Sequence, residues 1–248
     1  MFSLSLVEVL VAALMLFAGS TVLGTVGFGI GMTTTPVLLL TFDPQTVVVL
    51  VNTVSLAVFA LIILQGREHL DVGRMAPMTI AGLLGVPVGV FILSSVGDSA
   101  LRVSIVAVII PVTVVVALNL RRSIPRSIWF DVVVGFVVGV LLTSLGIGGP
   151  LMALFLLASD WSRHAIRTAL AFYFLVIELT GVIGYGVAGL FTVERLSLVL
   201  VVAVPVLLGF GLGTILVNHM DERLFRRSVV AVIMATSLMV LGREVLSL

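Results

Sequence analysis

The chain has 248 residues, of which 60% are hydrophobic and 10% are charged, with a formal net charge of +1 and no cysteine. Soluble domains carry roughly 25% charged residues, so this composition excludes a soluble globular protein and predicts a polytopic membrane protein. The net charge itself says nothing about nucleic acid, but no basic patch suggests such a partner, so none is expected. The lack of cysteine excludes disulfides and thiolate-bound metals.

Taken in chain order, the expected membrane segments lie between charged or turn-rich gaps. The first segment, residues 9–42, has 34 residues without a charge. It is long for one span and short for two, because about 20 apolar residues cross a bilayer. Single spans follow until residues 132–159, where 28 uncharged residues repeat the pattern of the first segment. The gaps are residues 41–46, 65–74, 94–102, 119–128, 158–167, 190–195 and 218–227.

The two long segments belong to two halves that match each other along the chain. The stretch RVSIVAVI at residues 102–109 reappears as RRSVVAVI at residues 226–233, with six of eight positions identical at an offset of 124. The matches occur in the same order in both halves, which predicts one membrane domain of two repeats, residues 1–122 and 123–248. The matching glycines are Gly29 and Gly31 with Gly146 and Gly148 (offset 117), and Gly85 and Gly89 with Gly209 and Gly213 (offset 124).

Each long segment contains a glycine cluster at which a helix is expected to break. Glycine costs a helix roughly 1 kcal/mol and an interior proline about 3 kcal/mol, and the clusters read GFGIGMTTTP and TSLGIGGPL. Two topologies follow. If each segment is one long helix, each half has four spans and the halves are parallel. If each segment turns back at its glycines, each half crosses an odd number of times and the halves are inverted.

The positive-inside rule distinguishes these topologies, since arginines in short loops accumulate on the cytoplasmic side. The parallel topology divides the arginines seven to six, and the inverted topology divides them ten to three, with Arg102, Arg195 and Arg243 on the poorer side. We therefore predict an all-α transmembrane helical bundle of two inverted repeats, each with a glycine-broken helix or helical hairpin plus three further helices. Both termini are then outside the cytoplasm. Whether the first arm of each hairpin crosses completely stays open.

The glycine clusters are the predicted binding site. Broken helices are tolerated in a membrane inside protein or around a water-filled cavity, and transporters hold substrates where half-helix N-termini converge. Pro150 suits the first turn of a new helix, whose free N–H groups and dipole attract an anion. The alternative is that these small residues only allow close packing. The predicted substrate-binding residues are Gly29, Gly31, Thr33, Thr34, Thr35, Asn52, Thr143, Ser144, Gly146, Gly148, Gly149 and Pro150.

The two glycine-rich stretches, each leading into a short apolar helix within a duplicated unit of roughly 120 residues, resemble the sulfite exporter TauE/SafE family, also called TSUP. The resemblance covers essentially the whole chain. It implies an integral membrane transporter of small sulfur-containing anions such as sulfite, thiosulfate, sulfoacetate and related organosulfonates. The family's first motif is closer to G-x-G-G-G, so Met32 and Thr33 depart from it, whereas residues 146–150 are nearer to the pattern.

Glu178 is the only acid well inside a predicted span. It is a candidate proton carrier coupled to anion movement, and the alternative is a protonated carboxyl that is hydrogen-bonded in the packing. Arg163 and Arg167 are interpreted as topology determinants, with attraction of anions to the cytoplasmic mouth as the alternative. No metal or cofactor is expected, because the histidines are far apart in the sequence: His69, His164 and His219.

These observations predict a secondary transporter that works by alternating access around the two glycine clusters. No enzyme is expected, because no histidine or lysine lies within a span to activate a serine, and Asp131 has no acidic partner. Two alternatives stay open: a passive anion channel, and a membrane subunit that delivers sulfur compounds to a partner. We predict a multi-pass protein of the bacterial cytoplasmic (inner) membrane, whose partners are a small anion and the lipid bilayer. A homo-oligomer is neither required nor excluded.

Overall fold

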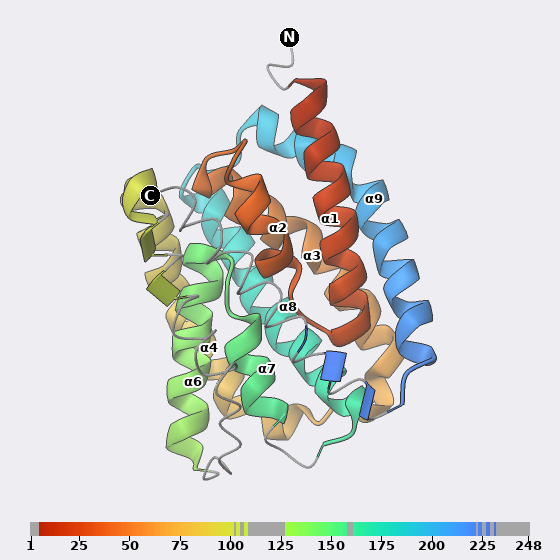
Figure 1. The fold of residues 1–248 in the computed structure, drawn as a ribbon. Helices are drawn as coiled ribbons and strands as arrows, with labels where there is room; N and C mark the ends of the chain where they lie inside the picture. The colour runs from red at the N-terminus through yellow and green to blue at the C-terminus, as the bar shows by residue number, and fades with distance from the viewer. Residues whose placement is uncertain are drawn as a thin grey trace.

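The computed structural model describes residues 5–101, 103–104, 107–108, 127–157, 161–221, 223–224, 227–228 and 231, and the regular structure of this part is helical (Figure 1). Six of its helices are long and apolar enough to cross a membrane. The predicted all-α, polytopic membrane bundle is therefore confirmed. The long helices are α1 (Leu6–Val26), α3 (Pro44–Gly66, continued by the 3-10 helix Arg67–His69), α4 (Val72–Ser95), α6 (Ile128–Leu145), α8 (Arg163–Val187) and α9 (Val193–Asn218).

Several long helices begin where the sequence supplies a side-chain cap. Ser5 and Glu8 form a reciprocal capping box at the start of α1. The Asp43 carboxylate accepts a backbone hydrogen bond in the first turn of α3, and the Thr192 hydroxyl does the same for α9. Such a cap stabilises a helix by about 1 kcal/mol. Polar residues at the boundaries therefore fix where these spans start.

Both glycine clusters end one helix and start a second, short one. α1 is followed by Gly27 with a φ of 87°, and α2 (Ile30–Leu38) starts after Gly29 with a φ of 103°. α6 is followed by Gly146 with a φ of 69°, and α7 (Gly149–Leu157) comes next. Residues with a side chain rarely adopt such positive φ values, so these turns require glycine. The break that the sequence predicts in each long segment is present.

The two arms of each broken segment differ in length. The first arms, α1 and α6, are among the helices long enough to cross a membrane. The second arms, α2 and α7, have nine residues each, which rise only about 13 Å. The helix ends of the two broken segments lie 119 residues apart, which places Gly27 opposite Gly146 and Gly29 opposite Gly148, whereas the glycine match in the sequence has an offset of 117.

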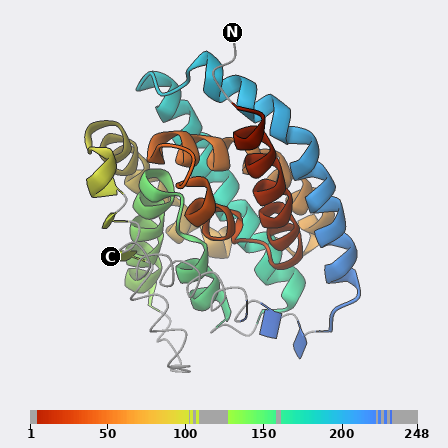
Figure 2. The same cartoon turned by 45° about the horizontal axis from the view of Figure 1, so that its top comes forward.

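The long helices form two outer pairs and one central pair. α9 lies beside α1 at one edge of the bundle, α4 lies beside α6 at the other edge, and α3 packs against α8 between them (Figures 1 and 2). Glycines bring the outer pairs close together: a Cβ on Gly85 would lie 2.6 Å from the Phe136 carbonyl oxygen, and one on Gly209 would collide with the Phe17 carbonyl oxygen. Small residues allow this approach between membrane helices. The same contacts include Gly24, Gly82, Gly135 and Gly139.

The helices run in two opposite directions. In Figure 1, α1, α3 and α9 run one way and α4, α6 and α8 run the other. Arg195, near the start of α9, therefore lies at the end of the bundle where α3 begins, and it pairs there with Asp43 at 3.2 Å. The opposite end, where α3 ends and α8 begins, holds Arg67, Arg74, Arg163, Arg167 and, just beyond α9, Arg223. Residues outside the described part include Arg102, Arg121, Arg122, Arg126, Arg226, Arg243 and most of the repeated octapeptides.

Candidate functional site

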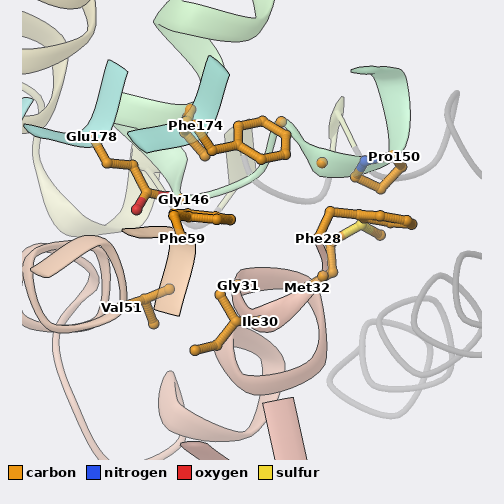
Figure 3. Close-up of a pocket in the computed structure, with 14 residues that line it drawn as sticks. Phe28, Ile30, Gly31, Met32, Val51, Phe59, Gly146, Pro150, Phe174 and Glu178 are labelled. Carbon is orange, nitrogen blue, oxygen red and sulfur yellow. The ribbon is translucent and has the colours of Figure 1, made fainter. Parts of the chain in front are cut away.

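The two glycine breaks meet inside the bundle and line one pocket. Gly31 packs so closely on the backbone of the second break that a Cβ there would collide with the Gly146 carbonyl oxygen. A Cβ on Gly149 would lie 2.7 Å from the Phe28 ring of the first break. Figure 3 shows residues of both breaks around the same space. The lining residues are Phe28, Gly29, Ile30, Gly31, Met32, Val51, Phe59, Leu142, Gly146, Gly148, Gly149, Pro150, Phe174 and Glu178.

The starts of α2 and α7 supply backbone donors to this pocket. The first helical bond of α2 runs from the Thr33 amide to the Gly29 carbonyl, and that of α7 runs from the Met152 amide to the Gly148 carbonyl. Amides in the first turn before these bonds have no partner within the helix. Ile30, Gly31 and Gly149 carry such amides and line the pocket. The partial positive charges at the N-terminal ends of α2 and α7 are therefore both directed at the pocket.

Three aromatic rings and one carboxyl complete the wall. Phe59 of α3 and Phe174 of α8 are in contact, with ring centroids 5.5 Å apart. Figure 3 shows the Glu178 carboxyl, which projects from α8 on the same side of the pocket as the Phe59 ring. Glu178 is 2% exposed, and its Oε2 accepts a hydrogen bond of 2.6 Å from the Ser55 hydroxyl. The pocket thus combines backbone donors, an apolar wall and one titratable group.

The profile of the family described as "Sulfite exporter TauE/SafE" matches residues 11–240 of the chain. The chain belongs to the TauE/SafE family. No curated protein and no solved structure matches it. TauE/SafE proteins are membrane transporters and not enzymes, so the predicted family and the predicted non-enzymatic function are confirmed. Membership indicates a multi-pass protein that resides in a lipid bilayer and exports a small sulfur anion.

In this TauE/SafE chain, the predicted site residue Asn52 lies beside the pocket and holds α6 in place. Its Nδ2 donates to the Leu142 carbonyl at 3.1 Å and to the Tyr185 hydroxyl at 2.9 Å. Tyr185 in turn donates to the Thr143 carbonyl at 2.7 Å. Both carbonyls belong to the last turn of α6, and the Leu142 carbonyl also accepts from the Gly146 amide at 3.0 Å. Asn52 and Tyr185 therefore cap the helix that ends at Gly146.

The predicted hydroxyl ligands lie away from the pocket wall. Thr34, Thr143 and Ser144 each donate to a carbonyl one turn earlier in their own helix, at 2.6–2.8 Å. Thr33 and Thr35 have buried hydroxyls without a hydrogen-bond partner in the described part of the chain. The described lining of the pocket includes none of these five side chains. What the fold brings together is the backbone of the two breaks, together with Glu178.

Arg167, predicted to be a topology determinant with attraction of anions as the alternative, is a buried functional candidate. It is 5% exposed, and its Nε donates to the Gly24 carbonyl at 2.9 Å. The sequence signal for this role was its position four residues into α8, because a residue one turn inside a span can face the core as well as the loop.

The histidines also differ from expectation, since the rings of His69 and His164 lie 5.2 Å apart. Among the described residues no cluster of three potential metal ligands occurs.

Proposed function

We propose that this protein is a secondary transporter that binds a small sulfur-containing anion between the starts of α2 and α7. The observation that carries the proposal is the convergence of two broken helices on one pocket, with Gly31 against Gly146. Sulfite, thiosulfate, sulfoacetate and related organosulfonates present several anionic oxygens to such donors. Neutral amides and helix dipoles bind an anion without a permanent ion pair, which favours release as well as binding.

We further propose that residues 1–122 and 123–248 are inverted repeats, which gives the protein two nearly equivalent conformations for alternating access. One support is a matched pair of contacts. Gly27 of the first break packs on the backbone of Arg167 in α8, and Gly146 of the second break lies against Val48 in α3. Both members of the second contact are 119 residues from their counterparts in the first. Opposite helix directions in the two halves are a second support.

The proposed symmetry also relates the two side-chain pairs beside the pocket. Ser55 corresponds to Phe174 and Phe59 corresponds to Glu178, again at a separation of 119 residues. The first pair is the Ser55–Glu178 hydrogen bond, and its counterpart is the contact between the two phenylalanine rings. The proposed repeats therefore have equivalent backbones but different side chains. The second repeat has the Glu178 carboxyl where the first has the Phe59 ring.

We propose that Glu178 carries a proton together with the anion. The Ser55 hydroxyl has one proton and three oxygen neighbours, Glu178 Oε2 at 2.6 Å, the Val51 carbonyl at 2.7 Å and the Asn52 carbonyl at 3.4 Å. When Glu178 is charged, the hydroxyl donates to the carboxylate. When Glu178 is protonated, it donates to the hydroxyl, which turns its own proton to the Val51 carbonyl. The contacts accommodate both protonation states, which a proton carrier requires.

The arginine-rich end of the bundle is the cytoplasmic face in this proposal, because arginines accumulate on that side of a bacterial inner membrane. The described arginines at this end include Arg67, Arg74, Arg163, Arg167 and Arg223, against Arg195 at the other. Export then runs from the end where α8 begins to the end where α3 begins. A passive channel would have the same polarity, so the experiments must measure uphill transport as well as binding.

The first test is thermal stabilisation of the detergent-purified protein by sulfite, thiosulfate, sulfoacetate, taurine, sulfate and acetate. A ligand that binds only the folded state stabilises it by about 2.7 kcal/mol at a hundred times its dissociation constant. We expect a selective rise in melting temperature with one sulfur anion. Gly148→Leu is expected to abolish the rise, because a Cβ there already lies 2.8 Å from Val138 Cγ1.

Gly211→Leu is the matched control, since a Cβ at Gly211 of α9 would have no neighbour within 4 Å. This variant is expected to keep the anion response of the unsubstituted protein. If no anion stabilises the folded protein, the pocket is not an anion site, and the glycines serve packing alone. If Gly148→Leu keeps the response while it folds normally, the anion binds elsewhere.

A further inference from the structure

The guanidinium of Arg167 is a buried cation without a carboxylate partner in the described part of the chain. Its hydrogen bonds go to two neutral oxygens, the Gly24 carbonyl and the Gln65 side-chain Oε1. The ion pairs of the described residues involve other side chains. Removing an isolated charge from water costs several kcal/mol unless it is compensated. Gly24 lies in the last turn of α1, and the negative end of that helix dipole supplies part of the compensation.

The donors of Arg167 are only partly used. A guanidinium carries five N–H groups, of which Nε uses one on Gly24, and Nη1 and Nη2 each use one on Gln65 Oε1, at 3.3 Å and 3.2 Å. One N–H on each terminal nitrogen is left. Two N–H groups on a single oxygen form the fork that guanidinium groups offer to an oxyanion. Gln65 places a neutral amide oxygen where an anionic oxygen binds more strongly.

The fork opens toward the arginine-rich end of the bundle. Gln65 is exposed in the last turn of α3, whereas Arg167 is buried against α1. Gly27, which follows α1, packs on the Arg167 backbone, with a distance of 3.1 Å from a Cβ at Gly27 to Arg167 Cα. The next residue, Phe28, lines the central pocket. Arg167 therefore lies between the outside of the protein and the pocket, beside the first break.

Among the described residues, no such cation lies at the other break. Gly146 lies against Val48, an apolar residue, at the position that corresponds to Arg167. A cation that only capped a broken helix would be equally useful at both breaks, but α6 is capped by the neutral side chains Asn52 and Tyr185. The charge is on the arginine-rich side alone, which is the side from which an exported anion arrives.

We propose that Arg167 and Gln65 form a second anion-binding site, an entry station that receives the sulfur oxyanion before it reaches the central pocket. The anion displaces the Gln65 oxygen from the fork and is held by Nη1 and Nη2 of Arg167. This inference rests on the proposed function, because it gives the station the same substrate class as the pocket.

Gln65→Glu tests the station. The new carboxylate provides the fork with a permanent anionic partner, so the folded protein is expected to be at least as stable as before, while the fork no longer releases its partner to sulfite. Sulfite exchange in proteoliposomes is expected to fall about tenfold or more, the loss that corresponds to one strong charge-assisted contact. A merely structural Arg167 would gain from the ion pair, and its transport would not change.

Gln45→Glu is the matched control at the opposite end of the protein. Gln45 Oε1 accepts from Arg195 Nη2 at 3.4 Å, so the substitution adds the same charge beside an arginine of the other mouth. We expect it to keep most of the exchange rate. If both variants lose exchange equally, the effect is one of general charge and the station is overturned. It is also overturned if Gln65→Glu exchanges sulfite like the unsubstituted protein.

Gln65→Ala guards against a folding defect at this position. It leaves the fork open, so it is expected to keep sulfite exchange, and an equal loss in Gln65→Ala and Gln65→Glu would overturn the proposal. The failure of the proposed function has a different signature. In that case the unsubstituted protein neither exchanges sulfite nor is stabilised by it, and the station falls with the pocket.

Discussion

Gly31→Ala is expected to lower the affinity for the sulfur anion by about a hundredfold or more, the equivalent of about 3 kcal/mol. The added methyl group would collide with the Gly146 carbonyl oxygen, so the two breaks must move apart. Donors at the starts of α2 and α7 would then no longer reach the same anion. Hydrogen bonds to a charged group contribute roughly 1.5–3 kcal/mol each, so losing those of one helix is sufficient for this effect.

The measurement is isothermal titration or thermal shift with the anion that stabilises the unsubstituted protein most. Gly211→Ala is the control, because it makes the same chemical change in α9 where a Cβ has open space. Circular dichroism should show unchanged helix content in both variants. Binding of normal strength to Gly31→Ala would contradict a site built from the contact between the two breaks.

Glu178→Gln is expected to abolish proton-driven accumulation of the anion and to remove the pH dependence of its binding. Glutamine resembles the protonated carboxyl in shape and cannot ionise. Two like charges about 6 Å apart repel by about 3 kcal/mol at an effective dielectric constant of about 20. In alkaline buffer, where the carboxylate of the unsubstituted protein opposes a second negative charge, the variant should therefore bind the anion about tenfold or more tightly than the unsubstituted protein.

The measurement compares thiosulfate binding in mildly acidic and mildly alkaline buffer, because thiosulfate does not change its charge between them. Around Glu178, α3 contributes the neutral side chains Ser55 and Asn52, and Tyr185 is a titratable neighbour within α8. Tyr185→Phe therefore serves as the control and should keep the pH dependence. If Glu178→Gln still accumulates thiosulfate against its gradient when a proton gradient is imposed, Glu178 is a packing residue and the coupling group lies elsewhere.

The membrane class and the breaks were predictable because they depend on composition and on local backbone preferences. Long uncharged segments and glycine clusters can be read directly from the sequence, and several of these glycines have a positive φ in the structure. Pro150 lies in the first turn of α7. The glycine match in the sequence has an offset of 117 and the helix ends have one of 119, since apolar stretches match almost equally well at neighbouring offsets.

The side chains of the site were harder to predict because neighbouring residues on a helix point about 100° apart. The hydroxyls of Thr34 and Ser144 stand next to the breaks in sequence but bond to their own helices. Arg167 and Tyr185 acquire their roles from residues more than 40 positions away. A single sequence gives no measure of these long-range contacts. Glu178 was found because a carboxyl at that depth is rare enough to stand out alone.

The outer pairs of helices have a consequence for how the protein is assembled. α1 finds its neighbour α9 in the other half of the chain, and α4 finds α6 in the same way, with backbones in close contact through Gly85 and Gly209. In each outer pair, one helix comes from the first half of the chain and the other from the second half. We therefore expect α1 and α4 to pack fully only after the second half has entered the membrane. In the proposed alternating access, each outer pair would therefore move as a body that joins helices from both halves of the chain.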